Sequence, residues 1–376
     1  MAASARSNAS VVVAGIRESA VTTAPGAAAS VAGMTDAEIL TNVADGVGHI
    51  TLNRPRAINA LTYGMITLIT ETLQEWRSHS EVSLVVLDGA GDRGLCAGGD
   101  IRALWENSSA GRNIDSRVFF RDEYRLNALI ARYPKPVVAL MTGITMGGGI
   151  GVAGHASIRV VTDSSRLAMP ETRVGFAPDV GGTWLLGRAP GRLGEYLGLN
   201  AVTMSAADAI EAGFADYLVD DERMPHLRQA LAERADPGSP AEVVLLFDET
   251  PPVSRLAADR AWIDACYSAD TVPEIMERLR GRGEEQAHAA ADELAALSPT
   301  ALAVTLAGVR AARASGSLEA ALELEYRTSA WLIEQPDLRE GIRAQVIDKD
   351  RSPQWMPLIP DAAELALGNE LPDSVF

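Results

Sequence analysis

The sequence lacks the features that mark several common protein classes. It has only two cysteines, Cys96 and Cys266, far apart along the chain, which excludes a disulfide framework and a zinc-type cysteine cluster. No apolar run approaches the ~18 residues that a membrane span needs. Aromatic residues make up only 5%, but 47% hydrophobic and 22% charged residues are ordinary for a globular protein, so whole-chain disorder and a fibrous structure are also excluded.

Positive charge is scarce as well. The 33 lysines and arginines face 50 aspartates and glutamates, a net charge of −17, and only Lys135 and Lys349 are lysine. An acidic chain lacks the basic surface that sequence-independent binding to nucleic acid requires, so we expect neither nucleic acid nor a membrane as a partner. A polyanionic ligand would have to be held by local dipoles or a few arginines. The preference for arginine and alanine is typical of a GC-rich genome and favours a bacterial cytoplasmic protein.

The first 33 residues differ from the rest of the chain. Met1–Gly33 is rich in Ala, Ser, Val and Thr, shows no periodicity and contains a single acid, Glu18. We expect a disordered extension, or translation that begins at Met34. An acid-poor segment with Arg and Ser also resembles a transit peptide, which would place the protein in the mitochondrial matrix if its source is eukaryotic.

Residues 34–220 are predicted to form an α/β core. Short apolar runs alternate with segments of helical periodicity, which is the pattern of a mostly parallel sheet with connecting helices. The predicted strands are Gly48–Leu52, Leu84–Leu87, Pro136–Met141 and Ile158–Val161, and the predicted helices are about 63–78 and 116–133. A glycine-rich turn is predicted over Gly143–Gly151.

Residues 221–376 are predicted to form a helical C-terminal region. Segments rich in Ala, Leu and Glu follow one another there, and no repeat of fixed period is evident. Helices are predicted near Val253–Tyr267, Val272–Arg280, Glu284–Leu297, Pro299–Ser315 and Ser317–Gln335.

The glycine cluster at 147–154 can be interpreted in several ways. Gly149-x-Gly151-x-x-Gly154 matches a dinucleotide-binding fingerprint, but the acid expected about 20 residues after the first glycine is Asp163, only 14 residues on. A P-loop is excluded because no Gly-Lys-Ser/Thr follows. Alternatively, the amide of Gly148 and one from the Leu95–Asp100 loop could form an oxyanion hole. Spacing alone equally allows two tight turns without a catalytic role.

Resemblance to a known family decides between these interpretations. Cys96–Arg102 (CAGGDIR), Gly143–Gly149 (GITMGGG) and Met169–Thr172 (MPET) resemble the crotonase, or enoyl-CoA hydratase/isomerase, superfamily. Segments similar to its 3-hydroxyisobutyryl-CoA hydrolase branch are Phe119–Asn127, Pro178–Gly182, Ser298–Thr300, Glu325–Arg327 and Ile347–Trp355. The resemblance covers nearly everything from about Met34 to Pro357, and the order and spacing of the motifs are specific.

The resemblance implies a fold and the two backbone amides of an oxyanion hole. The fold is crotonase-like α/β, a spiral of ββα units, with a helical C-terminal extension. The amides of Gly99 and Gly148 would polarise the carbonyl of an acyl-CoA thioester. Hydratases of the superfamily have a glutamate three residues beyond the middle glycine, where this sequence has Gly151. One half of the hydratase acid/base pair is therefore missing.

By the same resemblance, three acids are catalytic: Glu123, Glu171 and Asp179. Carboxyls crowded into one partly buried site acquire different pKa values, which separates a proton donor from a charged base or nucleophile. We expect Glu171 to be the principal catalytic carboxylate, and Asp179 to position the substrate hydroxyl or share in proton transfer. Each acid has a structural alternative: a solvated acid beside Arg121 and Arg125 for Glu123, a helix N-cap for Glu171 and a turn acid for Asp179.

The remaining site expectations concern CoA, metals and assembly. Arg54, Arg56 and Arg102, with Asp100 beside them, are candidates for binding CoA. No metal and no separate cofactor are expected, because the five histidines show no metal-binding spacing and CoA is part of the substrate. Cys96 is expected to be a small buried thiol. Relatives in the superfamily form trimers, so a trimer-based homo-oligomer is an open expectation.

The expected activity is hydrolysis of 3-hydroxyisobutyryl-CoA, or of a similar short 3-hydroxyacyl-CoA, as in valine degradation. Two alternatives remain open at this point. One is hydration or double-bond isomerisation of an enoyl-CoA on the same fold, and the other is acyl-CoA binding without catalysis.

Overall fold

A six-stranded sheet organises the fold of the computed structural model, which describes residues 37–233 and 240–376. The predicted N-terminal extension, residues 1–33, lies outside the described residues. Ala37–Phe376 forms one compact unit, which includes both the α/β part and the helical C-terminal part.

The strand order is β1-β2-β3-β4-β6-β8, and all neighbouring strands are parallel except the antiparallel pair β1 and β2. The central strands β3 and β4 are apolar and almost entirely buried, as expected for parallel strands that are covered on both faces. The strands are β1 (Ile39–Ala44), β2 (Val47–Leu52), β3 (Leu84–Gly89), β4 (Val137–Met141), β6 (Ile158–Val161) and β8 (Tyr217–Leu218).

A second, two-stranded sheet supports the glycine-rich segment. Strand β5 (Ile144–Met146) pairs in parallel with β7 (Arg166–Ala168), and helix α4 (Gly148–Ala153) follows β5 almost directly. The prediction of a single turn over Gly143–Gly151 is therefore wrong. A side-chain carbon at Gly149 would lie 2.5 Å from the Cys96 carbonyl oxygen, so glycine is what allows α4 to lie this close to that loop.

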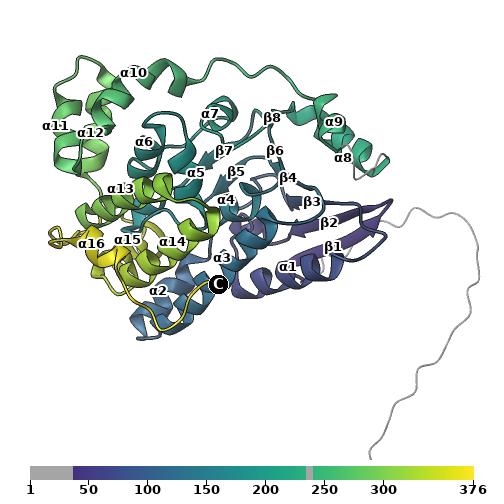
Figure 1. The fold of residues 1–376 in the computed structure, drawn as a ribbon, viewed down its shortest axis with the longest axis horizontal. Coiled ribbons are helices and arrows are strands. Elements are labelled where there is room, and N and C mark those ends of the chain that lie inside the picture. The colour runs from purple at the N-terminus through teal and green to yellow at the C-terminus, as the bar shows by residue number, and fades with distance from the viewer. Residues whose placement is uncertain (1–36, 234–239) are drawn as a thin grey trace, which may run out of the picture. The chain divides into compact units, whose positions relative to one another are not determined.

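Helices surround the sheet and build the C-terminal region (Figure 1). The helices of the α/β part are α1 (Tyr63–Trp76), α2 (Ile101–Ser109), α3 (Asn113–Ala131), α4, α5 (Gly182–Arg188), α6 (Leu193–Leu199) and α7 (Ala206–Glu211). Those that follow are α8 (Met224–Glu233), α9 (Pro240–Leu245), α10 (Arg255–Tyr267), α11 (Val272–Arg280), α12 (Glu285–Ala295), α13 (Pro299–Ala314), α14 (Leu318–Leu332), α15 (Pro336–Ile342) and α16 (Ala362–Leu367). Short helical turns are η1 (Pro55–Ala57), η2 (Glu171–Val174), η3 (Asp221–Arg223) and the π-helical η4 (Arg343–Ile347).

Two hydrophobic clusters lie on opposite faces of the sheet. Side chains alternate along a strand, so Leu84 and Val86 of β3 join the smaller cluster, whereas Val85 and Leu87 join the larger one. Helices α8 and α9 cover the smaller cluster. The larger cluster continues into the C-terminal helices, where α13 contacts α5 and α6 while α14 contacts α3.

None of the described helices is by itself long and apolar enough to span a membrane, although α12 and α13, bent by 116°, would be long and apolar enough together.

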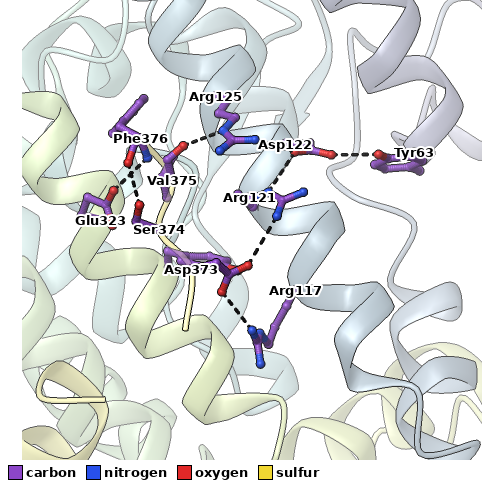
Figure 2. Close-up of polar contacts among 11 residues, drawn as sticks. Tyr63, Arg117, Arg121, Asp122, Arg125, Glu323, Asp373, Ser374, Val375 and Phe376 are labelled. Carbon is purple, nitrogen blue, oxygen red and sulfur yellow. Dashed lines mark hydrogen bonds and ion pairs between the residues drawn. The ribbon is translucent and has the colours of Figure 1, made fainter. Parts of the chain in front are cut away.

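The last residues of the chain bind along α3 (Figure 2). Arg117 donates to Asp373 Oδ1 at 2.9 Å and Arg121 donates to Asp373 Oδ2 at 3.4 Å. One helical turn further on, Arg125 donates to the carbonyl oxygen of the fully buried Val375 at 2.5 Å. The C-terminus therefore bridges three arginines that are spaced at i, i+4 and i+8 on α3.

The predicted elements agree with the structure where apolar periodicity is strong. Helix α11 has the predicted bounds, because Thr271 and Glu274 form a capping box at its start and Gly281 follows its end. Strand β1 and helix α2 were not predicted. Residues 40–42 of β1 are exposed and α2 buries only Leu104, so neither segment shows a clear apolar face.

Candidate active site

One pocket of about 450 Å³ contains the predicted catalytic acids together with the two predicted glycine turns. Its wall is formed by the Gly98–Gly99 turn, the start of α4, helices α2 and α3, η2, the turn before α5, and α15 with η4. Apolar side chains from α2, α3, α15 and the loop after η2 also line the pocket: Leu104, Phe119, Phe120, Leu338 and Phe176. The site is thus a mostly apolar cavity with a few polar groups, as is usual for a small-molecule site.

Two backbone amides at the pocket wall have no hydrogen-bond acceptor in the part of the chain that the structure describes. Gly99 lies in a bridge with Leu61, and Gly148 is the first residue of α4. A side-chain carbon at Gly148 would lie 3.1 Å from the Gly99 nitrogen, so the two turns are in contact. Among the backbone hydrogen bonds of the described residues, none is donated by Gly99 or Gly148. Both N–H groups are available to a ligand oxygen.

Backbone hydrogen bonds hold these two turns in place. The amide of Leu61 donates to the Gly98 carbonyl at 2.8 Å, and the amide of Met146 donates to the Cys96 carbonyl at 2.9 Å. Cys96 itself is fully buried, and burial raises the pKa of its thiol to about 12. The prediction of a small buried thiol is confirmed.

Glu123 projects from α3 into the pocket and is only 2% exposed. Its Oε1 has no partner among the described residues and lies 2.7 Å from the position of a side-chain carbon on Gly148. The alternative of a solvated acid beside Arg121 and Arg125 is therefore wrong. Glu123 is buried in the pocket, whereas both arginines bind the C-terminal residues. Burial, and then the negative charge of Asp179, raise the pKa of Glu123 well above its usual value.

Glu171 opens η2 and lies on the other side of the same glycine turn. Its Oε1 is 2.8 Å from the position of a side-chain carbon on Gly147, and its Oε2 is enclosed without a partner among the described residues. The N-cap of η2 is Pro170, so the alternative of Glu171 as an N-cap is wrong. Burial, and then the charge of Asp179, raise the pKa of Glu171 well above its usual value.

Asp179 is the third buried acid and is 7% exposed. Its carbonyl accepts a hydrogen bond from the Gly182 amide at 2.6 Å, as in a turn, while its side chain lines the pocket. Oδ2 accepts a hydrogen bond from the Tyr124 hydroxyl at 2.7 Å. Burial raises the pKa of Asp179 to about 7, and the hydrogen bond from Tyr124 opposes this increase.

The turn after Asp179 is strained and is held by a buried carboxylate. Val180 has a φ of 55°, which is rare for a β-branched residue, and Gly181 has a φ of 76°. Glu325 of α14 accepts hydrogen bonds from the amides of Gly181 and Thr183, at 2.6 and 2.9 Å, and from the Thr183 hydroxyl at 2.5 Å. His155 Nε2 lies 2.8 Å from the Val180 carbonyl oxygen.

No role for these supporting residues was predicted from the sequence. All are buried: Tyr124 is 0% exposed, Glu325 2%, and Ser329, whose hydroxyl lies 2.8 Å from that of Tyr124, 1%. Glu325 and Ser329 lie one turn apart on α14. Polar residues at buried positions of a helix need internal partners, so the buried stripe of α14 is the signal that could have indicated them. Which residues they contact could not have been predicted, because Ser329 is 205 residues from Tyr124.

The candidate CoA-binding residues are divided between the pocket and its surroundings. Arg102 and Asp100 line the pocket, and so does Arg173, which was not predicted. Arg54 lies outside the pocket lining and forms ion pairs with Glu38 at 3.0 Å and with Asp100 at 3.2 Å. Arg56 is exposed on η1 and does not line the pocket either. A role for these residues in CoA binding stays a prediction.

Histidine contributes little to the site. Burial lowers the pKa of His155 to about 4, so this ring is neutral and satisfies the Val180 carbonyl. Within residues 37–233 and 240–376, no group of three or more His, Cys, Asp or Glu side chains has the arrangement of a metal site.

Gly151 lies one turn into α4 and leaves no space for a larger residue. A side-chain carbon there would be 2.8 Å from Val180 Cβ and 2.9 Å from Asn127 Nδ2. Contacts this short cannot be accommodated without displacing the strained turn or α3. The position where a hydratase has its first glutamate is therefore closed to one here.

Comparison with known proteins agrees with the fold. Residues 47–365 match the enoyl-CoA hydratase/isomerase family. The chain belongs to this family. The crotonase-like fold and the superfamily resemblance inferred from sequence are thereby confirmed.

Two groups of family members are similar over most of their length. The chain is 42% identical over 328 residues to the mitochondrial 3-hydroxyisobutyryl-CoA hydrolase of Danio rerio, covering 85% of each chain. It is 39% identical over 333 residues to the protein of the same name from Homo sapiens, covering 86% of each. A carnitinyl-CoA dehydratase structure from Mycobacterium thermoresistibile has 45% identity and a TM-score of 0.86, over 90% of this chain and 98% of that one. An enoyl-CoA hydratase structure from Rhodobacter sphaeroides has 41% identity and a TM-score of 0.84, over 90% and 100%.

Proposed function

We propose that this member of the enoyl-CoA hydratase/isomerase family hydrolyses 3-hydroxyisobutyryl-CoA, or a closely similar short 3-hydroxyacyl-CoA, to the free acid and CoA. The observation that carries the proposal is the placement of Glu123, Glu171 and Asp179 around the unpaired amides of Gly99 and Gly148 in one pocket. The relatives named 3-hydroxyisobutyryl-CoA hydrolase, about 40% identical over most of the chain, support this choice of substrate.

The two amides would stabilise the oxygen of the thioester. They bind the carbonyl oxygen in the ground state and bind it more strongly when it becomes negative in the tetrahedral intermediate. Each donor of such a pair typically contributes about 10²–10³-fold in rate. Neutral amides can do this in a protein of net charge −17, because the stabilisation is local.

The carboxyls would carry out the displacement at the carbonyl carbon. We assign Glu171 to this carbon, because it lies against Gly147, beside the oxyanion amide. In one route Glu171 deprotonates a water, which forms the new carbon–oxygen bond, and the carbon–sulfur bond then breaks. In the other route Glu171 itself attacks, the carbon–sulfur bond breaks to leave a mixed anhydride, and water then hydrolyses this anhydride to the free acid and the Glu171 carboxylate. The departing thiolate takes a proton from a protonated carboxyl of the cluster.

Burial gives the cluster both of the states that this reaction needs. The raised pKa values of Glu123 and Glu171 and the pKa of about 7 for Asp179 imply that charged and protonated carboxyls coexist near neutral pH. Asp179 and Glu123 would also be the groups that bind the 3-hydroxyl of the substrate. Arg102 and Arg173 would meet the phosphates of CoA at the pocket wall.

Hydration of an enoyl-CoA is the second candidate, favoured by the names of the two similar structures. The closed position at Gly151 disfavours this candidate, since the second acid of a hydratase pair has no space there.

The names of the hydrolase relatives include "mitochondrial", which supports a matrix location if the source is eukaryotic.

The proposed function can be tested with three thioesters in parallel. We expect rapid release of thiol from 3-hydroxyisobutyryl-CoA. Isobutyryl-CoA, the matched control that lacks only the hydroxyl, should react about 10²-fold more slowly or worse, because buried polar groups would then be left unpaired. Hydration of crotonyl-CoA without thiol release from any substrate would overturn the proposal in favour of a hydratase. Tight binding without turnover of any of them would indicate a non-catalytic acyl-CoA-binding protein.

A further inference from the structure

Asp179 is the only one of the three candidate catalytic acids with a side-chain donor among the described residues. Tyr124 is fully buried, and its hydroxyl lies 2.7 Å from Asp179 Oδ2 and 2.8 Å from Ser329 Oγ. A tyrosine hydroxyl has one proton, and a charged carboxylate can only accept. The Tyr124 proton therefore points to Asp179, and Ser329 donates to Tyr124. The result is a directed chain of hydrogen bonds from α14 to the pocket.

We propose that Tyr124, supported by Ser329, is a positioning residue that keeps the first negative charge of the carboxyl cluster on Asp179. This inference rests on the proposed function, because the cluster is catalytic only if that function is correct.

Besides Tyr124, a hydrogen bond from the backbone of Asp179 also opposes the increase in its pKa, but Glu171 has the same kind of backbone bond, so the backbone does not separate these two acids. The charged groups that act most strongly on the cluster are other carboxyls. The negative charge of Asp179 raises the pKa of both Glu123 and Glu171, and Glu325 also raises the pKa of Glu171. Glu325 is itself an acid, so it cannot attract a negative charge to Asp179. Its oxygens accept hydrogen bonds from Gly181 and Thr183, and its pKa is raised to about 8. His155 contacts the same turn but is neutral.

A hydrogen bond to a charged acceptor is thus what separates Asp179 from its neighbours. It favours the charged form of Asp179 relative to those of Glu123 and Glu171, whose Oε1 and Oε2 atoms, respectively, have no partner among the described residues. Ser329 strengthens the effect, because a hydroxyl that accepts one hydrogen bond becomes a better donor in the next. The C-terminal helix α14 would in this way influence chemistry in the α/β part.

The ring of Tyr124 can stay in place without its hydroxyl. It stacks on Phe120 at 6.1 Å between centroids and meets the edge of Tyr326 at 6.4 Å. Tyr124→Phe should therefore fold while losing the two hydrogen bonds of the hydroxyl, the one to Asp179 and the one from Ser329. Tyr326→Phe is a matched control, because it removes a hydroxyl from the adjacent buried ring whose partner is Asp373 at 3.1 Å, away from the cluster.

The first measurement is the pH dependence of kcat/KM for thiol release. In Tyr124→Phe we expect the acid limb to move up by about one pH unit, which is the size of a lost hydrogen bond to a charged group. At pH values above the shifted limb, the rate should return to within about threefold of the native rate. Ser329→Ala should move the limb in the same direction by less, and Tyr326→Phe should not move it. A rate that falls equally at all pH values, or an unmoved limb, would overturn the proposal.

The second measurement does not depend on activity. Protein labelled with ¹³C at the aspartate carboxyl carbons is titrated by NMR, and Asp179→Asn identifies the Asp179 signal. We expect the midpoint of that signal to rise in Tyr124→Phe and to stay unchanged in Tyr326→Phe. If the wild type releases no thiol but the midpoint still rises, the proposed function fails and the role of Tyr124 stands. If thiol release is rapid and the midpoint does not move, the function stands and the inference about Tyr124 is wrong.

Discussion

Each acid of the candidate site comes from a different element of the fold. What the three acids share is burial in one pocket, which raises the pKa of each. Glu123 belongs to α3, Glu171 to η2, and Asp179 to the turn before α5. None of them would have an unusual pKa in solution, and each has a raised pKa in the pocket. The chemistry at the residue scale therefore depends on how the elements exclude water.

Replacement of Glu171 tests its assignment as the catalytic carboxylate. Glu171→Gln should lower kcat for thiol release by about 10²-fold or more, because an amide can neither attack nor accept a proton. Glutamine resembles the protonated acid that the buried site favours, so the melting temperature should not fall. Glu71→Gln, an exposed change on α1, is the control for kcat. Near-native kcat in both Glu171→Gln and Asp179→Asn would show that these acids are not catalytic.

The acids could be proposed from sequence because they stand in short motifs that resemble those of the family. Glu171 follows Pro170, and Asp179 begins the segment Asp179-Val180-Gly181-Gly182. The support around them could not be predicted in the same way. Tyr124 meets Ser329, and Gly181 meets Glu325, only after α14 has packed on the α/β part. These contacts depend on tertiary packing that no local pattern records.

At the scale of elements, the sequence indicates those that bury one face. Helices α11 and α13 were predicted within one residue of their bounds, since caps and apolar spacing agree there. The short helices α5 and α6 were missed. Both contain glycine and have only seven residues, and tertiary contacts with α13 stabilise them rather than local propensity.

The C-terminal residues offer a test of how one element stabilises another. Asp373 joins Arg117 and Arg121 of α3 (Figure 2). The buried residues of the same helix include Glu123. Asp373→Asn should weaken this attachment by about 1 kcal/mol, because its partners are partly exposed. Release of Val375 by carboxypeptidase should then become about fivefold faster, an effect that should shrink in 1 M salt.

Asp122→Asn is the matched control for this experiment. Asp122 pairs with Arg121 and Arg125 at a similar exposure, 26% against 33% for Asp373, but does not touch the C-terminal residues. It should leave the release of Val375 unchanged. Equal rates for Asp373→Asn and the native chain would show that the ion pairs do not hold the C-terminus.

At the scale of the whole molecule, the excess of acid has two distinct parts. The 50 aspartates and glutamates set the net charge of −17. A few of them are buried at and beside the pocket, where burial raises the pKa of Asp179 to about 7 and that of Glu325 to about 8. These two acids still take up protons near neutral pH.

Stability should therefore decrease between pH 6.5 and 8. In this range the native chain holds protons on Asp179 and Glu325 that the unfolded chain has already lost, so raising the pH favours unfolding. Integrated over the window, these two groups give a loss of about 2 kcal/mol. His155 acts in the opposite sense, since its pKa is lowered to about 4, but its effect is complete once its unfolded value of 6.5 is passed.

Urea unfolding followed by tryptophan fluorescence at pH 6.5, 7.2 and 8.0 would measure the decrease. Glu325→Gln is the informative variant, because it removes one titrating group from the native state. Its slope with pH should be about a third of the native slope, because Glu325 has the higher pKa of the two groups, even though the lost acceptor for Gly181 or Thr183 lowers stability at every pH. A native free energy of unfolding that is flat or rises over this window would contradict protonated buried acids at neutral pH. It would also remove the charge separation on which the proposed hydrolysis depends.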